Sequence, residues 1–268
     1  MAVVTLLSDF GLRDPYVAEM KGVILSICPG AKIVDISHEV EKFNLRMGAF
    51  FLASAAPYFP KNTIHLAVVD PGVGTKRRAI IIETERSLYV GPDNGILILS
   101  AQTEGIANVY HITNKRYMLP NVSRTFHGRD VFAPVAAHLA NNVKPKEFGP
   151  KIESYEKPSF TKPIVKGREI AGEILHIDGF GNIITNIPAS LIEKINLTEG
   201  CSLKIEVGKK MLKLKLCKAY GETEKGAPLA IIGSHNFLEL SVNMGNASEK
   251  LGIKQGELVK ITPITTSH

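Results

Sequence analysis

Alternating strand and helix patterns fill the first half of this 268-residue chain, and they constrain its fold more than any other feature. Val3 to Leu7 is a continuous apolar run, which is typical of a strand buried on both faces. Asp14 then fits a helix N-cap, with Pro15 at the first helical position. This alternation predicts an α/β fold, with a mostly parallel sheet and helices on both faces. Further strands are expected at 32–36, 63–69, 78–84 and 88–90, and helices at 44–58, 95–100 and 130–141.

The composition changes between Val143 and Gly167, where four prolines and six lysines stand among few apolar residues. Such a stretch is typical of a linker. We therefore expect an N-terminal α/β domain at 1–143, a linker at 144–167 and a smaller C-terminal domain at 168–268. Short strand patterns dominate this last part and predict an antiparallel sheet or a β-barrel-like domain. They lie at 169–177, 182–186, 202–207, 211–216, 228–232, 238–242 and 257–261.

The basic excess of the chain, a formal net charge of +6, has one dense stretch at 209–218. Its leucines and lysines alternate with period 2, which predicts a strand with one solvated face. An acidic partner is the alternative. Because aromatic residues that stack on bases are missing beside this stretch, no nucleic-acid partner is expected.

The cysteines and the apolar runs indicate the compartment. Cys28, Cys201 and Cys217 show no C-x-x-C spacing, so neither a disulfide framework nor a zinc cluster is expected. No basic region precedes the first apolar run. The longest apolar stretch, at 47–58, is shorter than the roughly 20 residues that cross a bilayer. The sequence therefore predicts a cytoplasmic protein with no membrane partner.

Two aspartates stand where buried strands are expected to end. Asp9 follows the first apolar run, and Asp70 follows the strand expected at 63–69. Ligands bind beyond the carboxyl ends of parallel strands, so both are candidates for a site. Turn or capping aspartates are the alternative, since Asp-Pro-Gly is a common turn sequence. The loop VDPGVG at 69–74 matches neither a Walker loop nor G-x-G-x-x-G, so a phosphate site is not expected.

The motif FHGRD at 126–130 precedes the last helix expected in the first half. A structural histidine is the alternative to a functional one, and Arg129 with Asp130 fits a merely local pair. The predicted topology, however, brings Asp70, Arg77 and His127 to one end of one sheet. A carboxylate, a guanidinium and an imidazole together suit the binding of water and the transfer of a proton near neutral pH.

Two loops of the second half carry further polar groups. The motif DGFGN at 178–182 lies between two expected strands, and the amide of Asn182 has the donor and the acceptor that suit a purine edge. A glycine-rich hairpin turn is the alternative. The segment GSHN at 233–236, with Glu239 downstream, has the same ambiguity.

Four motifs in this order resemble those of the S-adenosylmethionine hydroxide adenosyltransferases, which are relatives of the nucleophilic fluorinase and chlorinase. The resemblance covers nearly the whole chain and implies a catalytic set at Asp70, Arg77 and His127. The motifs are SDFG at 8–11, VDPGVG at 69–74 with Arg77 and Arg78, FHGRDVFAP at 126–134, and DGFGN at 178–182 with Thr185 and Asn186.

The same resemblance implies how the substrate, S-adenosylmethionine, is held. Asp9 and Asp14 are expected on the ribose hydroxyls, Asp178 on the amino group of the methionine part and Asn182 on the adenine edge. The site is expected between the N-terminal domain of one subunit and the C-terminal domain of its neighbour in a homotrimer, with no cofactor and no metal. The remaining substrate-binding residues it implies are Phe126, Tyr220, Ser234 and Glu239, although Tyr220 equally fits a core tyrosine.

The departures from the halogenases favour water as the nucleophile. The fluorinase has tyrosine in place of Asp70, threonine in place of Val73 and Tyr-Ser in place of His127 and Gly128. The expected reaction is therefore attack of water on C5′ of S-adenosylmethionine, which gives adenosine and L-methionine. Three alternatives are a halide-using enzyme, a non-catalytic sensor of S-adenosylmethionine or adenosine, and a metal-dependent hydrolase with ligands from Asp9, Asp14, Asp70 and His127.

Overall fold

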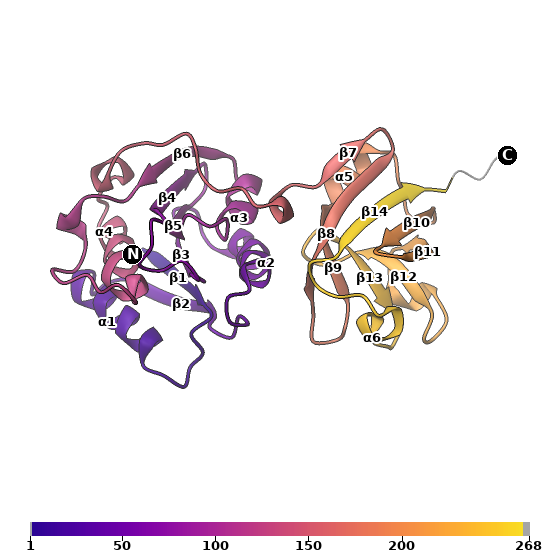
Figure 1. Ribbon diagram of the computed structural model, residues 1–268, viewed down its shortest axis with the longest axis horizontal. Helices are drawn as coiled ribbons and strands as arrows, with labels where there is room; N and C mark the ends of the chain where they lie inside the picture. The colour runs from indigo at the N-terminus through magenta and orange to yellow at the C-terminus, as the bar shows by residue number, and fades with distance from the viewer. Residues whose placement is uncertain (1, 265–268) are drawn as a thin grey trace. The chain divides into compact units, whose positions relative to one another are not determined.

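The computed structural model describes residues 2–264, and the chain divides into two compact units, Met1–Pro158 and Ser159–His268 (Figure 1). The change of unit falls inside the segment 144–167 that the composition marks as a linker. Parts of this segment are regular. It contains short 3-10 helices at Pro145–Phe148 and Ser159–Thr161, and the strand β7 (Ile164–Lys166).

Within residues 2–264, the first unit contains a six-stranded sheet in the order β2-β1-β3-β5-β4-β6. Strands β2, β1, β3 and β5 are parallel, whereas β4 is antiparallel to both β5 and β6. The predicted mostly parallel sheet is confirmed, but the sequence patterns did not indicate β6. The strands are β1 (Val3–Ser8), β2 (Lys32–Ser37), β3 (Ile64–Val68), β4 (Ala79–Thr84), β5 (Leu88–Pro92) and β6 (Ile106–His111).

Helices cover both faces of this sheet, as expected. In Figure 1, α1 (Tyr16–Ile27) and α4 (Ala133–Ala140) lie on one side of the sheet, and α2 (Leu45–Ala55) and α3 (Ile98–Thr103) on the other. Successive residues of β1 take part in different cores. Leu6 belongs to the core that contains residues of α1 and α4, and Leu7 to the core that contains residues of α2 and α3.

Two helices of the first unit begin differently from what the sequence pattern predicts. Asp14 does not cap α1: the helix begins at Tyr16, no side chain caps it, and the Pro15 carbonyl accepts the Glu19 N–H at 2.9 Å. The helix expected at 130–141 begins as a π-helical turn, Gly128–Phe132, which continues into α4. Such turns within α-helices often occur at functional sites.

The start of α2 follows the usual capping chemistry. The side chain of Asn44 accepts the Met47 N–H at 3.0 Å, which satisfies one of the free donors in the first turn. The helix expected at 44–58 then continues past α2 as a 3-10 turn, Ala56–Tyr58, that contains Pro57.

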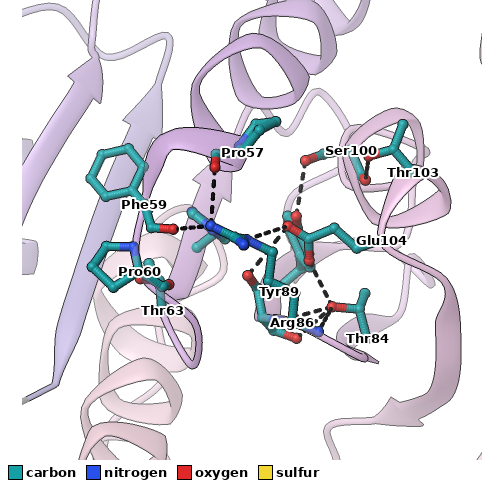
Figure 2. Close-up of polar contacts among 12 residues, drawn as sticks. Pro57, Phe59, Pro60, Thr63, Thr84, Arg86, Tyr89, Ser100, Thr103 and Glu104 are labelled. Atoms are coloured by element: carbon teal, nitrogen blue, oxygen red, sulfur yellow. Dashed lines mark hydrogen bonds and ion pairs between the residues drawn. The ribbon is translucent and has the colours of Figure 1, made fainter.

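A polar cluster fixes the end of the sheet at which β3 and β5 begin (Figure 2). Arg86, in the β4–β5 turn, donates to the carbonyl of Pro57 at 3.0 Å and to that of Phe59. Glu104, just after α3, accepts the Thr84 hydroxyl at 2.7 Å. These contacts tie the helical layer to the sheet at the end opposite Asp70, which follows the carboxyl end of β3.

The second unit forms a closed barrel. In its described residues, seven strands follow one another in the order β14-β10-β11-β12-β13-β9-β8, β14 pairs back with β8, and β7 adds to β8. The expected β-barrel-like domain is confirmed, although β11 and β12 are parallel. The strands are β8 (Glu169–Ile177), β9 (Ile183–Pro188), β10 (Ser202–Val207), β11 (Lys210–Cys217), β12 (Pro228–Ile232), β13 (Phe237–Val242) and β14 (Leu258–Pro263), and the short helices are α5 (Ala189–Lys194) and α6 (Ala247–Leu251).

The alternating stretch at 209–218 is β11, as the period of its leucines predicts. Leu214 and Leu216 are buried in the barrel core, whereas Lys213 and Lys215 are exposed. The basic residues therefore form the solvated face of a strand. Among residues 2–264, no helix has the length and apolar character needed to cross a membrane.

Candidate active site

Three loops of the first unit meet at one end of its sheet. Asp9 and Asp70 follow the neighbouring parallel strands β1 and β3, and His127 directly precedes the π-helical turn. The loop after Asp70 packs on the loop before His127, because a Cβ at Gly74, where φ is +74°, would lie 2.2 Å from the Arg124 carbonyl oxygen. Glycine is the residue that tolerates both this backbone conformation and this approach.

Arg77 joins the other two members of the expected catalytic set. Its Nε donates to Oδ1 of Asp70 at 3.1 Å, and its Nη2 donates to Oδ2 of Asp70. The same Nη2 lies 3.2 Å from Nδ1 of His127. Nη1 donates to the Arg78 carbonyl at 3.0 Å, and the guanidinium lies over the Phe132 ring. The side chains of Arg77 and Asp70 are only 8% and 5% exposed, so this ion pair is well shielded from water.

Burial and the contact with Arg77 together keep His127 neutral. Burial lowers the pKa of this imidazole below 6.5, and the positive charge of Arg77 lowers it further, against Asp70, Asp130 and a hydrogen bond with the Ser123 backbone. The ring is therefore neutral at pH 7. A guanidinium can only donate, so Nδ1 accepts from Arg77 and the ring proton is on Nε2.

A pocket of about 240 Å³ opens beside this cluster, within the first unit. Its wall brings together five residues that the sequence singled out: Asp9, Asp14, Asp70, Phe126 and His127. Its other lining residues are Phe10, Tyr16, Lys42, Phe43, Val68, Val73, Thr125 and Gly128.

Three aromatic rings form one side of the pocket. The centroid of Phe126 lies 5.6 Å from that of Phe10 and 5.2 Å from that of Tyr16, both edge to face. A Cβ at Gly128 would lie 3.1 Å from the Phe126 ring, so a glycine next to His127 leaves room for this ring. The sequence motifs include Phe10 and Phe126, but nothing in them indicated Tyr16, which is the first residue of α1.

Arg129 and Asp130 do more than form a local pair. Arg129 donates to Asp130 at 2.7 Å and to Glu19 of α1 at 2.7 Å, and its guanidinium lies over the Phe126 ring. Asp130 also accepts the Ser123 N–H at 2.8 Å. Burial alone would raise the pKa of Asp130, but the hydrogen bonds from Arg129 and Ser123 outweigh it, so the pKa is lowered and the carboxylate is charged. This network holds the loop that ends at His127.

Asp9 is held by a segment that the sequence did not single out. The Phe43 N–H donates to Oδ2 of Asp9 at 2.9 Å, and Lys42 Nζ donates to the Asp9 carbonyl. Phe43 has a φ of 65°, a conformation that is unusual for a residue other than glycine. Strained backbone of this kind concentrates at functional sites. Because Lys42 and Phe43 lie far from Asp9 in the sequence, the folded chain is needed to recognise them.

In the second unit, Asp178 and Asn182 form the turn between β8 and β9. Oδ1 of Asp178 accepts the backbone N–H groups of Phe180 and Asn182, each at 2.9 Å, and Oδ2 accepts the Asn182 side-chain amide at 2.9 Å. The hairpin-turn alternative is therefore correct for the local structure. The backbone carbonyl of Asn182 accepts the Asp178 N–H at 3.1 Å, whereas the second side-chain amide proton and the side-chain oxygen of Asn182 bond nothing within residues 178–182.

Glu239 and Tyr220 form a second polar group of the barrel. Tyr220 Oη donates to Oε2 of Glu239 at 3.3 Å. Burial raises the pKa of Glu239, the bond from Tyr220 lowers it, and the nearby charge of Asp178 raises it again, with a net upward shift. Ser234, by contrast, is exposed, in the turn between β12 and β13. In the described part of the chain, no three His, Cys, Asp or Glu side chains are grouped so that they could hold a metal ion.

Two family models match this chain, one over each of its two units. The SAM hydroxide adenosyltransferase N-terminal domain family matches residues 4–149, and the corresponding C-terminal domain family matches residues 172–260. The (R)-S-adenosyl-L-methionine hydrolase of Thermus thermophilus is 39% identical, over 97% of this chain and 100% of its own length. A fluorinase of Actinoplanes sp. is 27% identical, over 97% of both chains.

A solved structure is similar to this chain over nearly its whole length. The crystal structure of an uncharacterized conserved protein from Thermotoga maritima has a TM-score of 0.86 and 41% identity, and it covers 97% of this chain and 99% of its own. The two family matches together span well over half of the 268 residues. This chain belongs to the SAM hydroxide adenosyltransferase family.

Proposed function

We propose that this protein is a hydrolase that uses water to attack C5′ of S-adenosyl-L-methionine and releases adenosine and L-methionine. The observation that carries the proposal is the contact of Arg77 with both Asp70 and His127 beside a pocket. The relative from Thermus thermophilus is named as a hydrolase of the (R) form of this substrate, and the same form is proposed here.

The chemistry of the substrate explains why these three groups suffice. The sulfonium sulfur leaves as a neutral thioether when the C5′–S bond breaks, so no general acid is needed. The water oxygen forms the new bond to C5′ and must lose one proton. The protein therefore has to hold the water in line with the breaking bond and accept that proton.

We assign the proton to Asp70. Nδ1 of neutral His127 already accepts a hydrogen bond from Arg77, so it has no free lone pair for the proton of water. Asp70 lines the pocket, and its oxygens keep lone pairs beyond those that accept from Arg77. His127 fixes the guanidinium, and Asp70 holds the water. Arg77 keeps the carboxylate in place and stabilises the negative charge that develops on the attacking oxygen.

The charge of this cluster favours water over halide. Arg77 is neutralised by the Asp70 carboxylate, and His127 is uncharged at pH 7. A halide bound at this cluster would lie beside a carboxylate whose charge only balances that of Arg77, so the three groups offer no net positive charge to stabilise an anion in a shielded site. Supplying chloride or fluoride should therefore give no 5′-halo-5′-deoxyadenosine.

The remaining site residues are proposed to hold the two ends of the substrate. Asp9 and Asp14, both in the pocket wall, accept hydrogen bonds from the ribose hydroxyls. Asp178 receives the amino group of the methionine part, and Asn182 offers its unused amide proton and carbonyl to the adenine edge. Phe126 packs against the nucleoside. Tyr220, Ser234 and Glu239 complete the site.

The site is proposed to form between subunits of a homotrimer in the cytoplasm. The barrel residues Asp178 and Asn182 would then come from a neighbouring copy. Sedimentation equilibrium tests this directly, because a trimer has three times the 29.2 kDa chain mass. A monomer at all concentrations at which the enzyme is active would contradict the assignment.

Single-turnover conversion separates the hydrolase from the sensor. With enzyme in excess over S-adenosylmethionine, the hydrolase converts all bound substrate into equal amounts of adenosine and methionine. A sensor would return the substrate intact. The metal-dependent alternative predicts that a strong chelator stops turnover, whereas the proposed mechanism predicts unchanged activity.

A further inference from the structure

A Ser–His–Asp arrangement lies next to Asp9, with Ser8 and His38 buried and Asp35 exposed. Ser8, the last residue of β1, has its Oγ 2.7 Å from Nδ1 of His38, which follows β2. On its other side, Nε2 of His38 lies 3.1 Å from Oδ1 of Asp35. Ser8 is 0% exposed and His38 is 3% exposed.

The donors and acceptors of this arrangement can be assigned. The Phe10 N–H donates to Ser8 Oγ at 3.3 Å, so the serine proton is free to bond Nδ1 of His38. Nε2 of a neutral His38 then carries the proton that faces Asp35. Asp35 in turn accepts from Lys21 of α1 at 2.6 Å. Nε2 of His38 is buried and has Oδ1 of Asp35 3.1 Å away, but it forms no hydrogen bond of good geometry, so the bond to Ser8 is the one that holds the ring.

This order of groups resembles a hydrolytic triad, but Ser8 cannot act as a nucleophile. Its side chain is fully buried and is not part of the pocket wall, which begins one residue later at Asp9. A nucleophilic serine must reach the carbon that it attacks. The arrangement therefore has another purpose.

His38 contacts the segment that contains Asp9 at both of its ends. Its side chain bonds Ser8, just before Asp9, and its backbone carbonyl accepts the Gly11 N–H at 2.7 Å, just after Phe10. Gly11 has a φ of +70°, so the chain turns sharply between these two contacts. Asp9 and Phe10 both line the pocket and lie between the two contacts.

We propose that His38 is a positioning residue for the ribose of the substrate: through Ser8, it fixes Asp9 in the orientation that receives the ribose hydroxyls. The inference rests on the proposed function, in which Asp9 binds those hydroxyls. It predicts that loss of the Ser8–His38 bond weakens the recognition of the hydroxyl groups rather than of the base.

The chain offers a matched control for this contact. Thr5, also on β1, has its Oγ1 2.8 Å from Nδ1 of His65 on β3, and both residues are 0% exposed. This is again a β1 hydroxyl bonded to a histidine from the adjacent strand, but it does not flank Asp9. His65→Ala removes a buried histidine without touching the pocket wall.

The test is calorimetric binding of adenosine and of 2′,3′-dideoxyadenosine to the wild type and to His38→Ala, His65→Ala and Asp9→Asn. The wild type should prefer adenosine by about tenfold or more, as expected for hydrogen bonds to a charged group. Asp9→Asn and His38→Ala should lose most of this preference. His65→Ala should lower the melting temperature but keep the preference for adenosine.

Two results would overturn the inference. One is a folded His38→Ala variant that discriminates as the wild type does; the other is a wild type that binds both nucleosides equally. If His38→Ala does not fold, Ser8→Ala must lose the preference, and His38→Asn, whose amide can still bond Ser8, must retain it. Nucleoside binding needs no turnover, so a failure of hydrolysis would be seen separately in the product assay.

Discussion

Arg77 donates a hydrogen bond across 3.2 Å to Nδ1 of His127, and this contact leaves the imidazole without a free acceptor nitrogen. The histidine is buried enough that its pKa is lowered from 6.5, mainly by desolvation and then by the guanidinium itself. His127 therefore acts in its neutral form, as the group that fixes Arg77, while Asp70 binds the water and accepts its proton.

Replacing His127 with alanine should reduce the turnover number about 100-fold, because Arg77 and Asp70 lose a contact that positions them and a small displacement of reacting groups costs this much. Binding of S-adenosylmethionine should change far less, because the proposed ribose and methionine contacts remain. Single-turnover rates and equilibrium binding measure the two effects. His138→Ala, in α4 and outside the pocket wall, is the control and should retain activity. Equal activity of the His127 and His138 variants would remove His127 from the mechanism.

The turnover number should fall at acidic pH and be flat above neutrality. Protonation of His127 puts a proton on Nδ1, which breaks the bond from Arg77 and places two positive charges side by side. Because the pKa of His127 is lowered, the inflection should lie below 6.5. A pH–rate profile between pH 5 and pH 8 checks this, and an inflection above 6.5 would contradict it.

Removing the guanidinium should move the same pKa upward. In Arg77→Met the positive charge that lowers the pKa of His127 is gone, while Asp70 and Asp130, which raise it, remain. Titration of the His127 ring by NMR should therefore give a higher pKa in the variant than in the wild type. An unchanged value would mean that Arg77 does not contact the imidazole in solution.

Gly74→Ala should separate the two loops of the site. The new Cβ would lie 2.2 Å from the Arg124 carbonyl oxygen, at a φ of +74°. Strain of this kind costs on the order of 1–3 kcal/mol, so denaturant unfolding should show a loss of this size together with reduced activity. Gly22→Ala in α1 has no neighbour within 4 Å and should instead stabilise, by about 0.5–1 kcal/mol. Wild-type stability in Gly74→Ala would contradict the close approach.

The pKa of Glu239 predicts a pH-dependent effect on stability. Burial raises this pKa above 4.5 despite the bond from Tyr220, so the folded protein binds the proton more tightly than the unfolded chain. The stabilising contribution is complete below pH 4.5 and is lost as the pH rises through the folded pKa. Glu239→Gln, which stays neutral, should raise the melting temperature at pH 8 but not at pH 4. The exposed Glu193→Gln is the control, and no gain at pH 8 would contradict the upward shift.

The first unit was predictable because its central strands β1 and β3 are buried on both faces. Successive residues of the run at Val3–Ser8 lie in two different cores. Its sequence is therefore a continuous apolar run, without the alternation of polar and apolar residues that a surface strand shows. The strand at Ile106–His111 was missed because it lies at the sheet edge, where only Val109 is buried. Its mixed sequence shows neither a continuous apolar run nor a clean alternation.

The convergence of Asp70, Arg77 and His127 followed from topology together with the family resemblance. The residues that hold the loops around this set could not be predicted in this way. Glu19 accepts a hydrogen bond from Arg129, which lies 110 positions away in the sequence. The Phe43 N–H donates to Asp9 from a backbone with a φ of 65°. Neither a period nor a local motif marks such contacts. Asp14, expected as a helix cap, lines the pocket because α1 begins two residues later.

The origin of the new 5′-oxygen tests the account most directly. The protein is incubated with S-adenosylmethionine in water enriched in oxygen-18, and the adenosine is analysed by mass spectrometry. Attack of water at C5′ predicts one labelled oxygen in every adenosine molecule, at the 5′ position, together with unlabelled methionine. Adenosine without the label, or no adenosine at all, would contradict the proposed reaction.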